Sequence, residues 1–170
     1  MRRQAVAKEK KQDMTLSDLD PGVCNNAVLR QAARQLGQLY EDIISPSGLR
    51  ATQFGLLTYV VALDQPTMAR LAEALVMDLS ALGHTLKPLM RDGLVETFPD
   101  DRDKRAKRVR LTAAGERKVK AARALWTKAQ GRFEATFGKK KAAELRKTLS
   151  FLASDEFARA FVAVEPSATK

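Results

Sequence analysis

The sequence holds one cysteine and one histidine in 170 residues, so the side chains that most often carry metal and nucleophile chemistry are scarce. A lone cysteine excludes an internal disulfide and a cysteine-based metal cluster, and a lone histidine removes most other metal sites. No glycine-rich phosphate loop is present, and the acidic residues are dispersed among basic ones. We therefore expect no cofactor, no metal and no catalytic residues, and retain a small enzyme only as an alternative.

Long apolar runs are also missing. The uncharged run at residues 54–63 is too short to cross a bilayer, and the basic residues at the start are followed by a polar stretch rather than by the apolar segment of a secretory signal. We expect a soluble, cytoplasmic protein with no membrane partner. A hydrophobic content of 45% excludes disorder of the whole chain, and the length suits one compact domain with helical extensions.

Positive charge is present in excess. Thirty Lys and Arg against 20 Asp and Glu give a formal net charge of +10 and a pI near 10.0. More than half of this excess lies in residues 101–120, where nine basic residues accompany three acidic ones. Such a balance favours a polyanionic partner, and nucleic acid is the first one to test.

Apolar residues recur at helical spacing in six segments of the chain. The first predicted helix covers residues 25–44, and Thr52 and Thr67 are the predicted N-caps of the second helix and of a short third one. Asp78 is the predicted cap of the fourth helix, which ends at Gly93. A long fifth helix extends from Thr112 to Gly138, and Ala142 to Leu152 mark the last one. Residues 95–98 and 107–111 have strand character, and the charged stretch 99–106 joins them as a hairpin loop.

The helix after Asp78 has two different faces. We expect an inner face made of Leu79, Leu82, Leu86, Leu89 and Met90. The opposite face is polar and carries small residues near its start, as a helix needs in order to approach base edges in the major groove of DNA. A solvated helix face would have the same pattern. Its expected DNA contacts are Ser80, Ala81, His84, Thr85 and Lys87.

Two short helices followed at once by a hairpin with a basic tip have the order of a winged helix-turn-helix. An arginine-rich loop can follow the DNA backbone and place a guanidinium in the narrow minor groove. We expect the Asp103 carboxylate to orient the Arg105 guanidinium. The expected wing residues are Arg102, Asp103, Lys104, Arg105 and Arg108.

These elements predict a mainly α fold: a winged helix-turn-helix of about six helices and a two-stranded β-hairpin wing. The helices at the two ends carry apolar stripes that a chain this short has little core to cover, so we expect them to form a homodimer interface. The predicted organisation is a mobile basic arm at 1–20, a dimerisation region at 21–45 and 112–164, a DNA-binding region at 46–111 and a polar tail at 165–170.

The sequence resembles the MarR family of transcriptional regulators. The most specific part of the resemblance is the run from Asp100 to Ala106 that continues as Val109, Arg110, Leu111 and Thr112, which is similar to the family's wing. Residues 48–54, 86–89 and 92–95 are similar too. The resemblance implies a homodimer that reads a pseudo-palindromic operator on double-stranded DNA, usually as a repressor released by a small ligand or an oxidant.

By the same resemblance, Arg105 is the wing-tip arginine for the minor groove and Asp103 is its orienting acid. The recognition helix departs from the family, because Leu79 and His84 stand where related members often carry arginine. We therefore expect the wing to supply a larger share of the DNA affinity. A sequence-independent architectural DNA-binding protein is the main alternative, suggested by this helix and by the basic arm.

Two further sites are candidates for regulation. The resemblance implies an effector crevice between the dimer helices and the winged lobe for a small aromatic or phenolic carboxylate, and we place Tyr40, Arg50, Phe54 and Leu57 there. Trp126, Phe133 and Phe137 are interpreted as core or dimer packing. Cys24 lies just before the first helix, whose dipole favours a thiolate, so it is a candidate redox switch beside the alternative of an inert thiol.

Overall fold

The structure, a computed structural model, describes residues 20–164. The predicted polar tail and all but the last residue of the predicted basic arm lie outside the described residues. The chain divides into two units, the first ending at Leu36 and the second beginning at Gly37. In chain order the elements are η2 (Pro21–Val23), α1 (Asn25–Ile44), η3 (Ser45–Ser47), α2 (Ala51–Ala62), α3 (Met68–Ala74), α4 (Leu79–Arg91), β1 (Val95–Pro99), β2 (Lys107–Leu111), α5 (Ala113–Phe137), α6 (Lys139–Leu152) and α7 (Asp155–Ala163).

Side-chain caps begin the helices that position the site. Thr67, Asp78 and Thr112 each accept a hydrogen bond from a backbone N–H in the first turn of α3, α4 and α5, which confirms the three predicted caps. The predicted cap at Thr52 is wrong. The N-cap is Arg50, so α2 begins two residues earlier than a cap at Thr52 would place it. Gln53 Oε1 accepts from the N–H of Arg50 at 2.9 Å, and a Glu41 carboxylate oxygen accepts from the next N–H at 2.6 Å.

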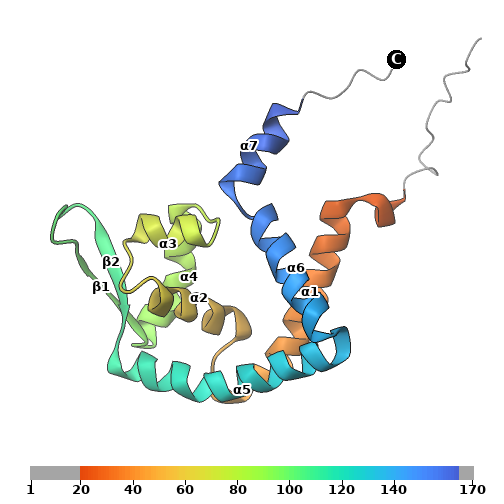
Figure 1. Ribbon diagram of the computed structural model, residues 1–170. Helices are drawn as coiled ribbons and strands as arrows, with labels where there is room; N and C mark the ends of the chain where they lie inside the picture. Colours follow the sequence, from red (N-terminus) through yellow and green to blue (C-terminus); the bar gives the residue numbers. More distant parts are fainter. Residues whose placement is uncertain (1–19, 165–170) are drawn as a thin grey trace, which may run out of the picture. The chain divides into compact units, whose positions relative to one another are not determined.

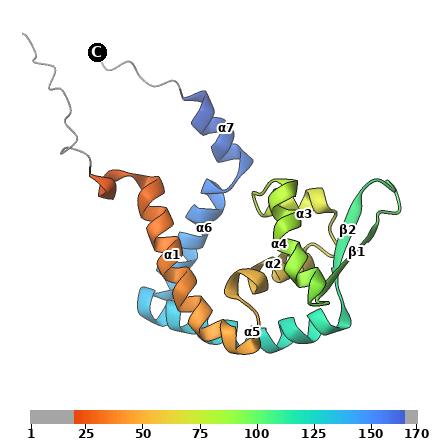
Figure 2. The same ribbon diagram turned by 180° about the vertical axis from the view of Figure 1, so that it is seen from behind.

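The core of the second unit lies among α2, α3, α4 and the hairpin, at the N-terminal end of α5 (Figure 1). Figure 2 shows the same grouping from behind, with α4 beside the hairpin. Leu82, Leu86 and Leu89 form the buried stripe of α4. The prediction that Leu79 and Met90 share this face is wrong, since they are 56% and 41% exposed. Leu79 lies in the first turn, and Met90 is rotated by about 100° from Leu89.

Gly115 and Thr112 hold the start of α5 against the end of α4 and the start of the wing. Gly115 lies in the first turn of α5 so near to β1 that a Cβ atom built on it would lie 2.0 Å from the backbone oxygen of Leu94. The hydroxyl of Thr112 donates to the backbone oxygen of Gly93 at 2.6 Å, and its backbone N–H donates to Leu94 at 3.1 Å. The start of α5 is therefore fixed against the end of α4 and the start of the wing.

The structure has one helix more, α7, than the six that were expected in the part of the chain it describes. Ser154 accepts from the N–H of Phe157 at 3.2 Å, and this cap is followed by acidic residues that suit a helix start. Phe157 packs edge-on against Phe151 of α6 with ring centroids 5.4 Å apart. Phe161 and Val162 are exposed, so much of the apolar surface of α7 is not covered by residues 20–164. Among residues 20–164, no helix is both long and apolar enough to cross a membrane.

Candidate nucleic-acid interface

The polar face of α4 is open to solvent. Ser80, His84, Thr85 and Lys87 are exposed and Ala81 is half-buried, all on the side away from the leucine stripe. The Thr85 hydroxyl donates its hydrogen to the backbone oxygen of Ala81 at 2.9 Å. It therefore offers a partner only acceptor lone pairs and its methyl group. The arrangement presents small and polar groups, with one lysine, at the start and middle of a helix.

The hairpin has an inner and an outer face. Antiparallel pairing places Thr97 opposite Val109 and Glu96 opposite Arg110. Residues directly opposite share a face of the sheet, so Val109, which is fully buried, and Thr97 face the core. Glu96 and Arg110 lie on the outer face, where the carboxylate accepts from Arg110 Nε at 2.7 Å. The Arg110 guanidinium also lies over the ring of Phe98, 4.7 Å from its centroid.

One buried carboxylate, Asp100, organises the tip of the hairpin. Its Oδ1 accepts from the backbone N–H groups of Arg102 at 2.8 Å and Asp103 at 3.0 Å, and its Oδ2 accepts from Arg108 Nε. The two backbone bonds, and then the bond from Arg108, lower the pKa of Asp100 to about 2. The carboxylate is therefore charged at neutral pH.

The predicted pairing of Asp103 with the Arg105 guanidinium is wrong. Asp103 Oδ1 instead accepts from the backbone N–H of Arg105 at 3.0 Å, while its backbone oxygen accepts from the N–H of Ala106 at 2.9 Å. A short acidic side chain in a tight turn reaches the backbone two residues ahead more easily than a distant guanidinium. Asp103 thus shapes the turn, and the exposed Arg105 side chain has no ion-pair partner among the described residues.

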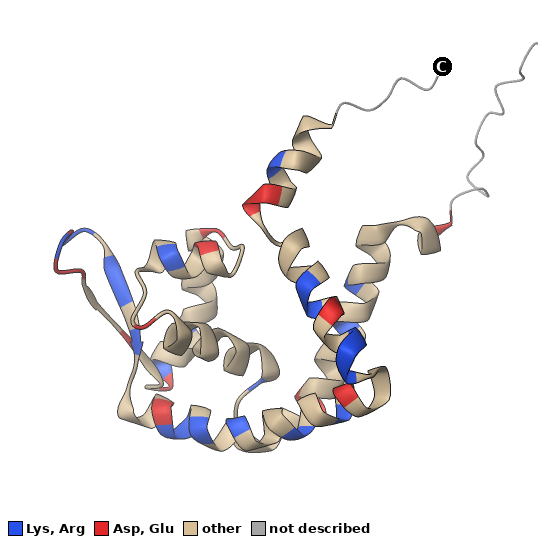
Figure 3. Cartoon of the chain, viewed as in Figure 1, with Lys and Arg blue, Asp and Glu red and all other residues tan. Residues whose placement is uncertain are grey.

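Figure 3 shows blue ribbon at the hairpin tip, along β2 and on α5. At the tip, Arg102 and Arg105 are exposed, and Lys104 makes only a long, solvent-exposed contact of 3.7 Å with Asp101. Along β2 the arginines are engaged by carboxylates. The structure therefore brings the predicted tip residues together, and separates them from Arg108, whose guanidinium is engaged by Asp100 and by the backbone oxygen of Gln65.

Comparisons with known proteins agree with this geometry. A family model described as a winged helix DNA-binding domain matches residues 56–115. The M. tuberculosis transcriptional regulator MosR, solved in complex with DNA, is 36% identical with a TM-score of 0.63, over 75% of this chain and 96% of that chain. The multiple antibiotic resistance protein MarR of Salmonella typhimurium is 35% identical over 78 residues, which are 46% of this chain and 54% of the relative. The chain belongs to the MarR family.

The chain spans about half the length of the curated MarR relatives it matches. The fold likeness extends further: E. coli MarR complexed with operator DNA has a TM-score of 0.69 at 24% identity, over 76% of this chain and 94% of that chain. The winged helix-turn-helix expected from the sequence is thereby confirmed for this MarR-family protein.

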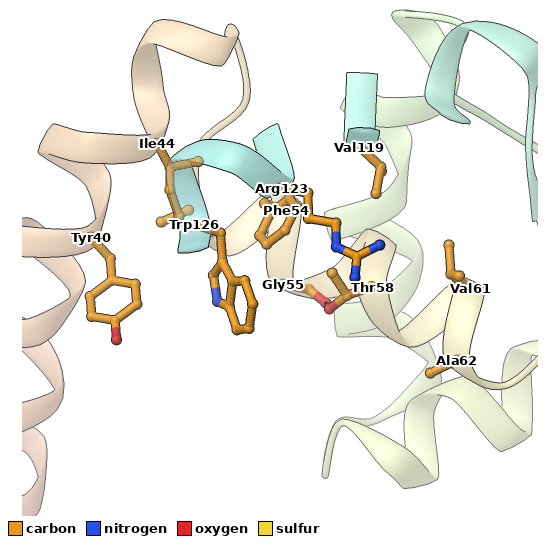
Figure 4. A pocket seen from close by; sticks show the side chains of 11 residues that line it. Tyr40, Ile44, Phe54, Gly55, Thr58, Val61, Ala62, Val119, Arg123 and Trp126 are labelled. Atoms are coloured by element: carbon orange, nitrogen blue, oxygen red, sulfur yellow. Dashed lines mark hydrogen bonds between the residues drawn. The ribbon is translucent and has the colours of Figure 1, made fainter. Parts of the chain in front are cut away.

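A pocket of about 560 Å³ lies in the second unit, between the end of α1, α2 and α5. Figure 4 shows Trp126 and Phe54 in its middle, with Tyr40 toward one end and Arg123 beside Thr58 toward the other. The rings of Phe54 and Trp126 are tilted, with centroids 6.4 Å apart. An aromatic wall with one nearby cation suits a flat organic anion.

The pocket contains two of the four residues that were expected to line an effector crevice. Tyr40 and Phe54 line it, whereas Leu57 is fully buried in the core and the exposed Arg50 is not among its lining residues. Leu57 faces the lobe interior because α2 is apolar on more than one side. The cation of the pocket is Arg123. Trp126, whose helical spacing favours core or dimer packing, is 39% exposed and lines the pocket.

The hydroxyl of Tyr40 begins a chain of hydrogen bonds between polar side chains. It donates to Gln130 Oε1 at 2.9 Å, and the amide of Gln130 donates to Glu134 at 3.5 Å. Arg146 of α6 reaches the same Glu134 oxygen at 3.4 Å. Burial raises the pKa of Tyr40 above its usual value, with Arg146 opposing and Glu134 adding to that shift. The phenol is therefore protonated at neutral pH and serves as a donor.

Cys24 lies where the sequence placed it, immediately before α1 in the first unit. Its thiol is exposed, and its backbone oxygen accepts from the N–H of Val28 at 3.0 Å, so it begins the helix. No group of three or more His, Cys, Asp or Glu side chains within residues 20–164 is arranged to hold a metal ion.

Proposed function

We propose that this protein is a sequence-specific, double-stranded-DNA-binding transcription regulator that acts as a homodimeric repressor on a pseudo-palindromic operator. It has no catalytic activity and works in the cytoplasm, where its operator is. The observation that carries the proposal is one lobe that exposes both a polar helix face on α4 and a hairpin tip with Arg105, which has no ion-pair partner among residues 20–164. Family membership and the DNA complex of MosR support it.

The two exposed features have complementary roles. Ser80, Ala81, His84, Thr85 and Lys87 face the major groove, where short polar groups and methyls can meet base edges. Arg105 enters the minor groove, with Arg102 and Lys104 on flanking phosphates. Because no arginine lies on the exposed α4 face ahead of Arg91, the wing supplies much of the affinity and α4 supplies the discrimination.

Homodimer formation is supported by apolar surface at both ends of the chain. Val28 and Leu39 of α1 are 45% and 49% exposed, and Phe151, Leu152 and Phe161 of the C-terminal helices are exposed as well. A second copy would cover these helices by an isologous interface and give two lobes. The two α4 helices would then read half-sites about one helical turn, roughly 34 Å, apart.

The test is footprinting and competition binding on the DNA upstream of the protein's own gene. We expect one protected pseudo-palindrome, with affinity at least about three decades above that for random duplex. Arg105→Ala should lower the affinity and reduce the slope of log K against log salt by about two, since each of the two lobes loses one phosphate or groove contact and fewer counterions are released. Unchanged affinity in that variant would remove the wing from the proposal.

The same experiment tests the alternative of a sequence-independent architectural DNA-binding protein. The arginine-poor face of α4 is the observation that favours it. Such a protein would bind random duplex nearly as well as any chosen site, with no discrete footprint. That result would replace sequence-specific regulation with packaging or bending of DNA.

We also assign the pocket to an effector, a small aromatic or phenolic carboxylate. Tyr40, Phe54 and Trp126 supply the aromatic walls and Arg123 the cation for the carboxylate. Trp126 is the only tryptophan in the chain, so its fluorescence reports on this site. Titration with 4-hydroxybenzoate should quench it saturably, Arg123→Gln should weaken the binding, and 4-hydroxybenzamide should bind poorly to the unaltered protein. Equal binding of acid and amide would contradict the role of Arg123.

A further inference from the structure

Arg108 occupies a position that its charge alone does not explain. It lies on β2, five residues after Asp103 of the tip turn, and its side chain is 34% exposed. On sequence it belongs with the cations offered to DNA. In the structure its guanidinium is directed to two partners of the protein itself, on opposite sides of the strand end.

The first partner is the tip. Arg108 Nε donates to Oδ2 of Asp100, whose side chain is only 7% exposed. The other oxygen of that carboxylate fixes the N–H groups of Arg102 and Asp103, as described above. Arg108 thereby neutralises and orients the buried carboxylate that holds the first part of the tip turn.

The second partner is the turn between α2 and α3. Arg108 Nη1 donates to the backbone oxygen of Gln65 at 2.8 Å. The adjacent Val109 N–H donates to the oxygen of Pro66 at 2.9 Å, and Thr67 forms an isolated antiparallel bridge with Arg108. The segment 65–67 thus adds to the edge of β2, immediately before Thr67 caps α3.

This turn is held in an unfavourable backbone conformation. Asp64 and Gln65 have φ of 50° and 55°, a region that non-glycine residues seldom adopt. Two consecutive residues in this region persist only where surrounding contacts fix them. The bond from Arg108 to Gln65 is one such contact, and it joins the start of the helix-turn-helix to the wing.

We propose that Arg108 is a positioning residue, not a DNA contact: it bridges Asp100 and Gln65 and so fixes the wing tip relative to the helix-turn-helix. This inference rests on the proposed DNA-binding function. The tip arginine and the recognition helix must meet neighbouring grooves of one duplex, so a loose joint between them weakens binding although every contacting side chain is still present.

Arg108→Lys separates this role from a contact with phosphate. Lysine keeps the charge, and as a point charge it serves a phosphate well, but it lacks the planar fork that reaches two partners at once. With the upstream duplex as the probe, we expect Arg108→Lys to lose about tenfold in affinity, comparable to Arg108→Ala. Binding of the lysine variant equal to the unaltered protein would overturn the proposal.

A double-mutant cycle with Arg105 gives the second arm. If Arg108 acts by placing the tip, Arg108→Lys should have little further effect once Arg105→Ala has removed the group being placed. Additive losses would show that Arg108 touches the DNA independently, and would overturn the proposal. The exposed neighbour Lys107 is the control, since Lys107→Ala should combine additively with Arg105→Ala.

A third arm needs no DNA. Amide hydrogen exchange of the free protein should quicken at Arg102, Asp103 and Val109 in Arg108→Lys and remain unchanged in Lys107→Ala. If the unaltered protein binds no duplex, the proposed function fails while this arm still reports on Arg108. Unchanged exchange in Arg108→Lys would overturn the positioning role by itself.

Discussion

The close approach of Gly115 to Leu94 gives the sharpest prediction about stability. Alanine at position 115 would place Cβ 2.0 Å from the Leu94 oxygen and 2.9 Å from its carbonyl carbon, both backbone atoms. Ordinary contact begins at 3.4 Å, so α5 would have to retreat by about 1.4 Å. Overpacking of this kind costs about 1–3 kcal/mol, and the retreat also stretches the Thr112 bonds to Gly93 and Leu94, each worth about 1 kcal/mol.

Alanine favours a helix over glycine by about 1 kcal/mol, which offsets part of this loss. We expect Gly115→Ala to lower the free energy of unfolding by about 2 kcal/mol or more, which is a fall in Tm of about 4–8 °C for a protein of this size. Urea and thermal unfolding measure it, at one protein concentration for every variant because dimer stability depends on concentration.

Gly131 is the matched control. It lies in the same helix, and a Cβ on it would meet no atom within 4 Å. Gly131→Ala should therefore raise stability by about 0.5–1 kcal/mol, the opposite sign for the same chemical change. Equal stabilisation by the two substitutions would refute the claim that the start of α5 is locked against the wing.

Three further outcomes are expected. The pKa of Asp100 is about 2 in the folded protein against an ordinary 3.8, so the stability that it contributes is complete above about pH 4 and is lost as the pH falls toward 2. Asp100→Asn should make the free energy of unfolding depend less on pH in that window. An unchanged dependence would contradict the Asp100 network. Thr112→Ala should cost about 1 kcal/mol of stability in urea unfolding and Thr112→Ser much less, because serine keeps the capping hydroxyl; equal losses would exclude the cap. If the exposed Cys24 is a redox switch, peroxide should release DNA from the unaltered protein but not from Cys24→Ser in a gel-shift assay, and release from both would eliminate the thiol as sensor.

Local rules predicted the helix starts at Thr67, Asp78 and Thr112 because an N-cap involves a side chain and backbone only two or three residues away. The same locality explains the failure at Thr52, because the start of α2 depends on Glu41, which accepts from the N–H of Ala51 ten residues further along the chain. The missed helix α7 had a local signal. Ser154 precedes two acidic residues, which is the pattern of a capped helix start.

Burial and pairing depended on distant parts of the chain and were predicted less well. Periodicity assigned Leu79 to the core, but it cannot show where the neighbouring elements end. Arg108 bonds to Gln65, which lies in a turn more than forty residues earlier, and local sequence does not predict that contact. Arg108 was therefore expected to act with the cations of the tip. Arg123 of α5 and Tyr40 of α1 line the same pocket although they are far apart in the sequence, and residue spacing alone does not predict this.

The distribution of paired charge also limits how strongly salt can affect DNA binding. Of the nine basic residues in 101–120, Arg108 and Arg110 are engaged by carboxylates, and three others lie on α5 outside the wing. The cations left for DNA on each lobe are Lys87, Arg102, Lys104, Arg105 and Lys107. In the proposed homodimer these make ten, which sets a slope of log K against log salt no steeper than about −9. A steeper slope would require further cations, either Arg91, which ends α4 and pairs with Asp92 at 3.2 Å, or residues on other elements of the chain.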